Sequence, residues 1–312
     1  MQEFIKKHIR PCGRISDQFI LGFALAFLLT LLGQLVGLLV NRVIRLAFFS
    51  GTGPEPAYFT TFLSYFAFIG IWITLIAAMM GAKNKPMLKA LGKGLSGNNL
   101  RMSLFGAFIG FSANAFCIGM SILFKDLSLY FNDFNIVIFL MLLFAVFIQS
   151  AAEEIVMRCY YYEKLRRRYK NPAIALICTA VAFAAMHLGN PGMTAWGLIQ
   201  IAVVGILFAV LVHYYNSLWA AFWVHTIWNF TQSILFGLPN SGIVVPYSNF
   251  MIDSASTGFF FHVANGVEGS PGACLILGII TVILFVYAKK HNLQPHDLWA
   301  AQEAAALQKA EQ

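Results

Sequence analysis

Eight apolar runs, each about as long as a membrane-crossing helix, constrain this chain more than any other feature. A helix needs roughly 20 residues to cross a hydrocarbon core about 30 Å thick. The runs cover residues 19–40, 58–80, 103–124, 136–158, 173–189, 196–215, 218–236 and 273–288. Only "GNPG" at 189–192 divides the fifth run from the sixth, so the sequence predicts seven or eight helices.

The composition agrees with these runs and excludes a soluble globular protein. Hydrophobic residues make up 59% of the chain and charged residues 11%, and the mean hydropathy is +0.72. A chain of this composition folds in a bilayer rather than in water. We therefore expect an all-α, integral, multi-pass membrane protein with about eight transmembrane helices.

Basic residues in the short loops predict the orientation of the helices, because topology follows Lys and Arg rather than net charge. With the N-terminus inside, the inner residues are Lys6, Lys7, Arg10, Arg14, Lys83, Lys85, Lys89, Lys93, Arg101, Lys164, Arg166, Arg167, Arg168, Lys170, Lys289, Lys290 and Lys309. The outer residues are Arg42, Arg45 and Lys125. This asymmetry predicts that both termini lie inside (N-in/C-in). The net charge of +8 then indicates topology and contact with anionic lipid, not nucleic-acid binding.

Three of the predicted helices carry ionisable or amide side chains where hydrocarbon is expected. An unpaired charge inside a membrane-spanning helix costs at least ~2.5 kcal/mol, so such residues indicate a functional site. They are Glu153, Glu154 and Arg158 in the fourth helix, His187 in the fifth, and His225 and Asn229 in the seventh.

The spacing of these residues predicts which of them act together. Glu154 and Arg158 are four residues apart, so they share a helix face and can neutralise each other. Glu153 is turned away by about 100°, which leaves it as a carboxylate with no partner on its own helix. His225 and Asn229 are also four residues apart and point in one direction.

The polar residues meet at one depth only if the fourth helix continues past Arg158. The aromatic run at 160–162 indicates that it reaches the basic cluster at 166–170, with the tyrosines as an interface anchor. At 1.5 Å per residue from the inner membrane boundary at that cluster, Glu153 lies roughly 20 Å deep and His187 roughly 24 Å deep. His225 lies roughly 12 Å deep and Asn229 roughly 18 Å deep. With some helix tilt, we expect a polar catalytic cavity inside the bundle.

This set of groups suits the hydrolysis of an amide. A glutamate removed from water is a general base for a water molecule, and a histidine beside it can share the proton. A second histidine and an asparagine offer N–H donors to a developing oxyanion.

Three short motifs in these helices resemble those of a known family. "EEIVMR" at 153–158 reads as E-E-x-x-x-R, "FAAMH" at 183–187 as F-x-x-x-H, and "HTIWN" at 225–229 as H-x-x-x-N. In this order, each on its own helix, they resemble the type II CAAX prenyl endopeptidase and bacteriocin-processing (CPBP, Abi-type) family of intramembrane proteases. The resemblance covers about 136–236 and implies a location in the plasma membrane of a bacterium. It implies three parts: 1–135 with three helices and an interfacial loop, 136–236 as the catalytic core, and 237–312 with an outer loop, the last helix and a cytoplasmic tail.

The resemblance also implies a role for each motif residue. The catalytic residues are Glu153 and His187, which activate the attacking water, and His225 and Asn229, which form the oxyanion hole. The structural residues are Glu154 and Arg158, which form a buried pair, and Phe183, which packs against the site. The implied substrate is a membrane-associated peptide or a lipidated peptide, in contact with membrane lipids.

The metal requirement is open, because this family is often described as metalloproteases. The chain has no H-E-x-x-H, but Glu153, His187 and His225 form a possible zinc set. A carboxylate mechanism needs only the groups already present, and asparagine is a poor zinc ligand. The residues therefore favour hydrolysis without a metal or cofactor, with zinc as the alternative.

Two other classes of function stay open. An ion-coupled transporter would relay protons through the same carboxylates and histidines, although the chain shows no internal repeat. A catalytically idle scaffold or bacteriocin immunity protein would keep the fold and bind a partner. Each residue also has a structural explanation: an ion pair for Glu154 and Arg158, a helix C-terminus for His187, and bonds between helices for His225 and Asn229.

Overall fold

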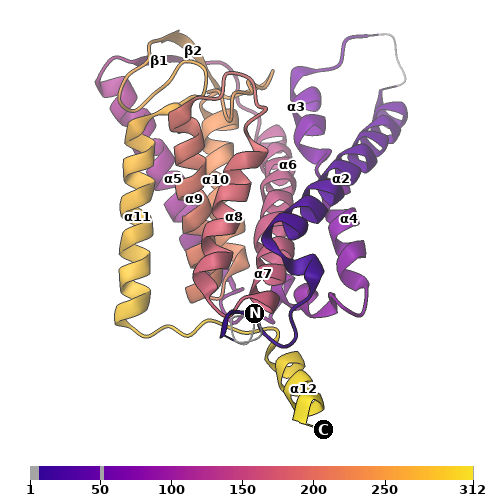
Figure 1. The fold of residues 1–312 in the computed structure, drawn as a ribbon. Coiled ribbons are helices and arrows are strands. Elements are labelled where there is room, and N and C mark those ends of the chain that lie inside the picture. The colour runs from indigo at the N-terminus through magenta and orange to yellow at the C-terminus, as the bar shows by residue number, and fades with distance from the viewer. Residues whose placement is uncertain (1–6, 50–52, 312) are drawn as a thin grey trace.

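A computed structural model describes residues 7–49 and 53–311, which form a helical bundle (Figure 1). Its elements are η1 (Ile15–Asp17), α2 (Phe19–Phe48), α3 (Ala57–Phe66), α4 (Ile69–Met80), η2 (Lys85–Leu91), α5 (Leu100–Leu123), β1 (Leu127–Phe131), α6 (Ile136–Glu154), η3 (Ile155–Tyr161), α7 (Tyr162–Arg168), α8 (Pro172–Met186), α9 (Ala195–Tyr214), α10 (Leu218–Phe230), η4 (Thr231–Leu235), β2 (Phe250–Ala255), η5 (Val267–Gly269), α11 (Pro271–Lys290) and α12 (Ala300–Glu311). Of the η elements, η3 and η4 are π-helices and the others are 3₁₀-helices.

Six helical segments of the described chain are long and apolar enough to cross a membrane. They are Phe19–Phe48, Ala57–Met80, Leu100–Leu123, Ile136–Arg168, Ala195–Tyr214 and Pro271–Lys290. Two further apolar runs form the shorter helices α8 and α10. The structure therefore confirms an all-α, multi-pass membrane protein, whereas the number of about eight crossings stays a prediction.

Side-chain caps fix where most of the site-bearing helices begin. In each case a side-chain oxygen accepts a hydrogen bond from a backbone N–H in the first turn, which satisfies a donor that the helix leaves free. The capping residues are Asn99 (α5), Asn135 (α6), Asn171 (α8), Thr194 (α9), Ser217 (α10) and Ser270 (α11). These starting points set the height of every site residue along its helix.

Glycines bring α5 against the backbone of α10, the helix of His225. A Cβ atom at Gly106 would lie 2.3 Å from the carbonyl oxygen of Ala220, and one at Gly110 would lie 2.5 Å from that of Val224. Small residues allow such close approach between membrane helices. The position of α10 is therefore fixed by backbone contact.

The N-terminal and C-terminal segments meet at one end of the bundle (Figure 1). The guanidinium of Arg10 pairs with Asp297 at 2.8 Å and also with Glu303 in α12. An even number of crossings requires the two termini to lie at the same end of the bundle, and the structure places them there. Which side of the membrane this is stays a prediction, and Lys6 lies outside the described residues.

Buried ionic and aromatic contacts close the same end of the bundle. Asp17 accepts two hydrogen bonds from Arg167, at 2.6 and 2.7 Å, and pairs with Lys164 at 3.1 Å. The indole N–H of Trp299 donates to Glu163 at 3.0 Å, and the Arg167 guanidinium carbon lies 4.6 Å from the Trp299 ring centroid. Trp299 and Arg167 are both fully buried.

The fourth apolar run continues as one helical segment through α6, η3 and α7, so it does reach the basic cluster. The expectation that its three tyrosines face the membrane interface is wrong, however. Tyr160, Tyr161 and Tyr162 are at most 4% exposed, because the N-terminal segment and α9 cover them. The Tyr161 hydroxyl donates to the Phe19 carbonyl at 2.9 Å, and the Tyr162 hydroxyl bonds His213 Nδ1 at 2.7 Å.

The sequence did not predict the two-stranded sheet at the opposite end of the bundle (Figure 1). Strands β1 and β2 are antiparallel, with Leu127 opposite Ala255 and Phe131 opposite Phe250. This pairing ties the α5–α6 connection to the long segment 237–270. The long segment is thereby held over the end of the bundle.

Candidate active site

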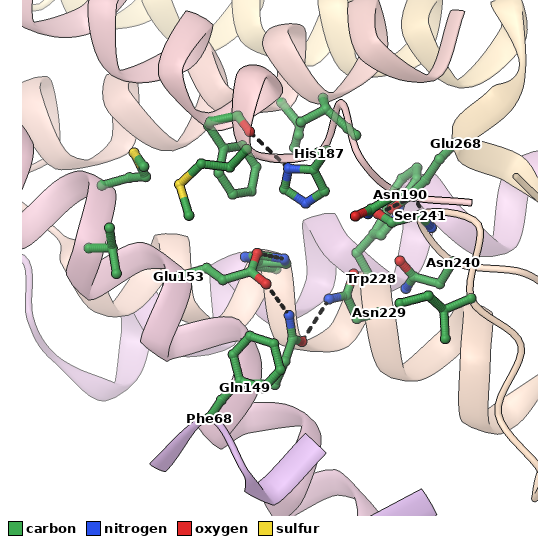
Figure 2. A pocket seen from close by; sticks show the side chains of 18 of the residues that line it. Phe68, Gln149, Glu153, His187, Asn190, Trp228, Asn229, Asn240, Ser241 and Glu268 are labelled. Carbon is green, nitrogen blue, oxygen red and sulfur yellow. Dashed lines mark hydrogen bonds and ion pairs between the residues drawn. The ribbon is translucent and has the colours of Figure 1, made fainter. Parts of the chain in front are cut away.

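A cavity of about 330 Å³ lies inside the bundle, and its wall contains all four predicted catalytic residues (Figure 2). They are Glu153 from α6, His187 from the end of α8, and His225 and Asn229 from α10. Phe183 also lines the cavity. The other two motif residues, Glu154 and Arg158, lie behind the wall and are fully buried.

Two helices change their hydrogen bonding beside this cavity. The α-helical part of the fourth segment ends at Glu154, where the π-helix η3 begins, and η4 begins at Thr231, two residues after Asn229. A π-turn is rare, shifts the residues that follow to a new face, and often occurs at functional sites. The two helices that carry most of the motif residues therefore both depart from α-geometry next to the motifs.

Arg158 and Glu154 form a buried ion pair. Arg158 Nη1 lies 3.1 Å from Glu154 Oε1, and both side chains are 0% exposed. Arg158 Nη2 donates to the Gly205 carbonyl at 3.0 Å, and its guanidinium carbon lies 4.6 Å from the ring centroid of Phe183 and 5.0 Å from that of Phe208. A buried pair with additional hydrogen bonds costs less than an isolated buried charge.

His225 is held between the two carboxylates of the fourth segment. Its Nδ1 lies 3.0 Å from Glu154 Oε1, and its Nε2 lies 3.8 Å from Glu153 Oε2. An ionised carboxylate only accepts hydrogen bonds, so Nδ1 carries a proton toward Glu154. The Phe208 ring stacks on the imidazole with centroids 5.3 Å apart. The orientation of His225 is therefore fixed from two sides.

The expectation that Glu153 has no partner on its own helix is wrong. Gln149, one turn earlier, donates from Nε2 to Glu153 Oε1 at 2.6 Å. The second oxygen, Oε2, is buried and has no hydrogen-bond partner. A buried carboxylate oxygen without a partner is unfavourable and indicates that a water or a substrate group belongs there.

His187 is the C-cap of α8 and presents one ring nitrogen to the cavity (Figure 2). Its Nδ1 lies 2.8 Å from the carbonyl oxygen of Phe183. Because a carbonyl can only accept, Nδ1 carries the proton and the Nε2 of a neutral ring keeps its lone pair. His187 therefore caps the C-terminus of α8, and its Nε2 can also take up a proton.

The amide of Asn229 is engaged with the fourth segment. Asn229 Nδ2 donates to Gln149 Oε1 at 3.1 Å and lies 3.3 Å from Ser150 Oγ. Gln149 therefore bridges Asn229 and Glu153 (Figure 2). Sequence reasoning missed Gln149, although it lies four residues before Glu153, the helical spacing at which side chains meet.

A third carboxylate, which the sequence analysis did not single out, also lines the cavity. Glu268 Oε2 accepts hydrogen bonds from the backbone N–H and hydroxyl of Ser241, at 2.7 and 3.0 Å, and its Oε1 accepts from Trp228 Nε1 at 3.2 Å. Burial raises the pKa of Glu268, and its hydrogen bonds with Ser241 and Trp228 offset this only in part. The local sequence "GVEGSPG" does not indicate that Glu268 is a site residue, because its partners Ser241 and Trp228 are distant in sequence.

The zinc set considered from the sequence is not assembled. In the part of the chain that the structure describes, no three His, Cys, Asp or Glu side chains are grouped so that they could hold a metal ion. His225 Nδ1 is engaged by Glu154 and His187 Nδ1 by a carbonyl. Both contacts use Nδ1 and leave Nε2 of each ring without a hydrogen bond, as in metal-binding histidines, so the metal requirement stays a prediction.

The fold and the cavity define an integral, multi-pass membrane protein with a polar site inside its helical bundle. Residues 135–231, about a third of the chain, match the family model described as type II CAAX prenyl endopeptidase Rce1-like. This match confirms the family resemblance that the three motifs indicated, and it supports an intramembrane endopeptidase with a peptide substrate. No curated protein and no solved structure matches the chain. The matched residues include all seven motif residues and Gln149, but not Glu268.

Proposed function

We propose that the protein is a glutamate-based intramembrane endopeptidase in which Glu153 activates the attacking water. The observation that carries this proposal is the difference between two adjacent carboxylates. Oε2 of each carboxylate has no hydrogen-bond partner, but Glu154 is fully buried behind the wall and bonds Arg158 and His225 through Oε1, whereas Glu153 lines the cavity. A general base needs a free lone pair within reach of the substrate water.

The charges of the cluster balance when His225 is protonated. Glu153 and Glu154 then carry two negative charges, and Arg158 and His225 carry two positive charges. A neutral cluster suits a site of low dielectric, where an unbalanced charge is costly. Protonated His225 can also donate from Nε2, the nitrogen that does not face Glu154.

The reaction then follows from these positions. Glu153 takes a proton from water, and the water oxygen attacks the carbonyl carbon of the peptide bond. The resulting oxyanion accepts hydrogen bonds from His225 Nε2 and from the amide of Asn229. The proton passes to the leaving nitrogen, with His187 Nε2 as the group that shares it, and the C–N bond breaks.

Gln149 must shift for Asn229 to bind the oxyanion. In the structure both contacts of Asn229 Nδ2 are made to Gln149 and Ser150. A substrate carbonyl that bonds Asn229 replaces the contact with Gln149. Gln149 therefore orients Glu153 and Asn229 when no substrate is bound, and a bound substrate replaces its contact with Asn229.

The test is cleavage of a quenched fluorescent peptide library, lipidated and unlipidated, by the purified protein in detergent. We expect cleavage by the wild type, and a loss of about 10²-fold or more in Glu153→Gln, because general-base catalysis contributes about 10² to 10⁴. Activity that survives a strong zinc chelator supports the glutamate mechanism. Activity lost with the chelator contradicts it.

The matched control is Gln200→Glu, which adds a carboxylate elsewhere on the wall of the same cavity. If the position of Glu153 matters, the double variant Glu153→Gln/Gln200→Glu stays inactive. Absence of cleavage by the wild type for every peptide contradicts the proposal and leaves the scaffold or transporter functions.

A further inference from the structure

The connection between α4 and α5 carries a dense group of basic side chains. It covers residues 81–101, includes η2, and joins two segments that are long and apolar enough to cross a membrane. It therefore lies at a membrane surface, and we call it the basic loop. The basic loop contains no Asp or Glu. Its cations, which are all exposed, are Lys83, Lys85, Lys89, Lys93 and Arg101.

The part of the chain that the structure describes supplies no counter-ion for these five cations. None of them forms an ion pair with a described carboxylate. The nearby terminal segments and α7 use their carboxylates elsewhere: Asp17 with Lys164 and Arg167, Glu163 with Trp299, and Asp297 and Glu303 with Arg10. Arg101 also lies in the first turn of α5, where the positive end of the helix dipole disfavours a cation. Because unpaired like charges repel, the basic loop is complementary to an anionic surface.

The apolar side of the basic loop is fixed to the bundle, so its charges point away from the bundle. Residues three apart share a face of a 3₁₀-helix, and Met87 and Ala90 of η2 are both buried. The Cys159 thiol donates to the Met87 carbonyl at 3.4 Å, and Arg167 Nη1 donates to the Lys83 carbonyl at 2.7 Å. The exposed cations are therefore carried by a backbone that is held in place.

Asn98 joins the basic loop to the start of α10. Its Oδ1 accepts hydrogen bonds from the backbone N–H groups of Leu218 and Trp219, at 2.8 and 3.1 Å. Its Nδ2 donates to the carbonyls of Ala90 and Gly92, both at 2.7 Å. The side-chain amide of Asn98 thus bonds the first turn of α10 and the backbone of the basic loop at the same time.

Two further hydrogen bonds make the same connection. Trp219 Nε1 donates to the Leu91 carbonyl at 2.9 Å, and Ser217 Oγ donates to the Gly97 carbonyl at 2.7 Å. His225 follows Trp219 by six residues, which is about 9 Å along the helix. Because both residues lie in one continuous helix, a displacement of the basic loop also moves His225.

We propose that the basic loop binds the anionic headgroups of phospholipids at the membrane surface, and that this binding keeps α10 in the position that catalysis needs. The headgroups neutralise the five cations, since Lys and Arg beside a membrane helix are attracted to a negatively charged lipid surface. Without these headgroups, repulsion between the cations loosens the basic loop and, with it, the start of α10. The lipid binding is independent of the proposed function, whereas the effect on cleavage rests on it.

The midpoint of thermal unfolding in a neutral detergent tests the lipid binding without activity. The protein is heated with added phosphatidylglycerol or with the same amount of phosphatidylcholine, which has no net charge. A ligand that binds only the folded protein raises the midpoint. We expect phosphatidylglycerol to raise the midpoint by at least about 3 °C more than phosphatidylcholine does. Equal midpoints with the two lipids overturn the proposal.

A pair of triple variants locates the binding. The loop variant replaces three exposed lysines of the basic loop: Lys85→Gln, Lys89→Gln and Lys93→Gln. The matched control has the same net charge and replaces three exposed cations elsewhere: Arg42→Gln, Lys125→Gln and Lys290→Gln. We expect the loop variant to lose at least half of the midpoint difference between the two lipids, and the control to keep it. Equal differences in both variants overturn the basic loop as the binding surface.

Cleavage in vesicles tests the effect on the site. A quenched peptide without net charge is given to the protein in vesicles of phosphatidylcholine alone and in vesicles with about 30% phosphatidylglycerol. We expect the wild type to cleave at least about fivefold faster with phosphatidylglycerol, and the loop variant to cleave at similar rates in both. A wild type that binds phosphatidylglycerol but cleaves equally fast in both vesicles overturns the coupling to α10. Absence of cleavage in vesicles and in detergent overturns the proposed function and the coupling together, while the unfolding midpoint still decides the lipid binding.

Discussion

At the scale of single residues, two neighbouring carboxylates receive different surroundings. Glu154 is fully buried and bonds Arg158 and His225. Glu153 is 16% exposed and lines the cavity, which Glu154 does not. Their positions along the helix explain this difference, because adjacent residues point about 100° apart. The same residue type thus supports the structure at one position and is available for chemistry at the next.

Gln149 gives a residue-scale prediction. Gln149→Ala removes the hydrogen bond that orients Glu153 and the contact that holds Asn229. A hydrogen bond to a charged group contributes about 1.5 kcal/mol, so we expect kcat to fall roughly tenfold. The measurement is the steady-state kinetics of peptide cleavage in detergent.

Gln200→Ala is the matched control, since Gln200 lines the same cavity and makes no hydrogen bond to the four proposed catalytic residues. We expect its kcat to stay within about threefold of the wild type. A Gln149→Ala variant with unchanged kcat would show that Gln149 does not position Glu153.

The residue contacts were only partly predictable. The spacing of four residues indicated the pair of Glu154 with Arg158, because that spacing places two side chains on one helix face. It did not indicate that Glu154 also bonds His225, since that contact depends on how α10 packs against the fourth segment. Gln149 escaped notice because a glutamine in a helix has many possible partners.

At the scale of elements, the segment between α10 and α11 forms part of the cavity wall. Its strand β2 pairs with β1, and its carboxylate Glu268 bonds both Ser241 in the same segment and Trp228 in α10. The apolar runs at 218–236 and 273–288 indicated an outer loop between them. They could not indicate the sheet, because short strands in loops depend on a distant partner for their hydrogen bonds.

Glu268 gives a pH prediction for this element. Burial raises its pKa above the usual 4.5, so the folded protein holds this proton to a higher pH than the unfolded chain does. Its contribution to stability is therefore complete below pH 4.5 and is lost as the pH rises through the raised pKa. The measurement is the midpoint of thermal unfolding in detergent between pH 4 and pH 8, at intervals of about half a unit.

Glu268→Gln keeps the shape of the side chain and removes the titrating group. We expect the decrease in the unfolding midpoint above pH 4.5 to be smaller in this variant than in the wild type. Parallel curves for the two proteins would mean that another group is responsible for the decrease.

The helices themselves illustrate what hydropathy predicts. The apolar runs indicated the helices because a membrane span needs a long apolar stretch. They did not indicate the two π-helices, since an extra residue in a turn leaves the hydrophobic composition unchanged. The π-turn at Ile155–Tyr161 helps to explain why the tyrosines point into the bundle instead of toward the interface.

At the scale of the whole molecule, a cluster of ion pairs joins the first and last segments of the chain. The distribution of Lys and Arg predicted that these segments lie on one side, and the structure places them together. The sequence could not indicate that Asp17 is the buried partner of Arg167 and Lys164, because these residues are about 150 positions apart.

Asp17→Ala tests whether this cluster of ion pairs stabilises the folded protein. The substitution leaves two buried cations without their partner, and breaking a buried pair costs about 3–5 kcal/mol. We expect a large decrease in the unfolding midpoint in detergent. The control is Glu55→Ala, which breaks the exposed pair with Arg45 and should cost less than about 1 kcal/mol. Equal decreases in the unfolding midpoint for the two substitutions would contradict a stabilising role for the ion-pair cluster.

The most direct test of the central claim compares Glu153→Gln with Glu154→Gln, measuring peptide cleavage and the unfolding midpoint of both in detergent. We predict that Glu153→Gln unfolds within a few degrees of the wild type and is inactive. We predict that Glu154→Gln loses about 3–5 kcal/mol of stability, because Arg158 keeps its charge without a counter-ion. A stable, fully active Glu153→Gln protein would contradict the assignment of Glu153 as the base.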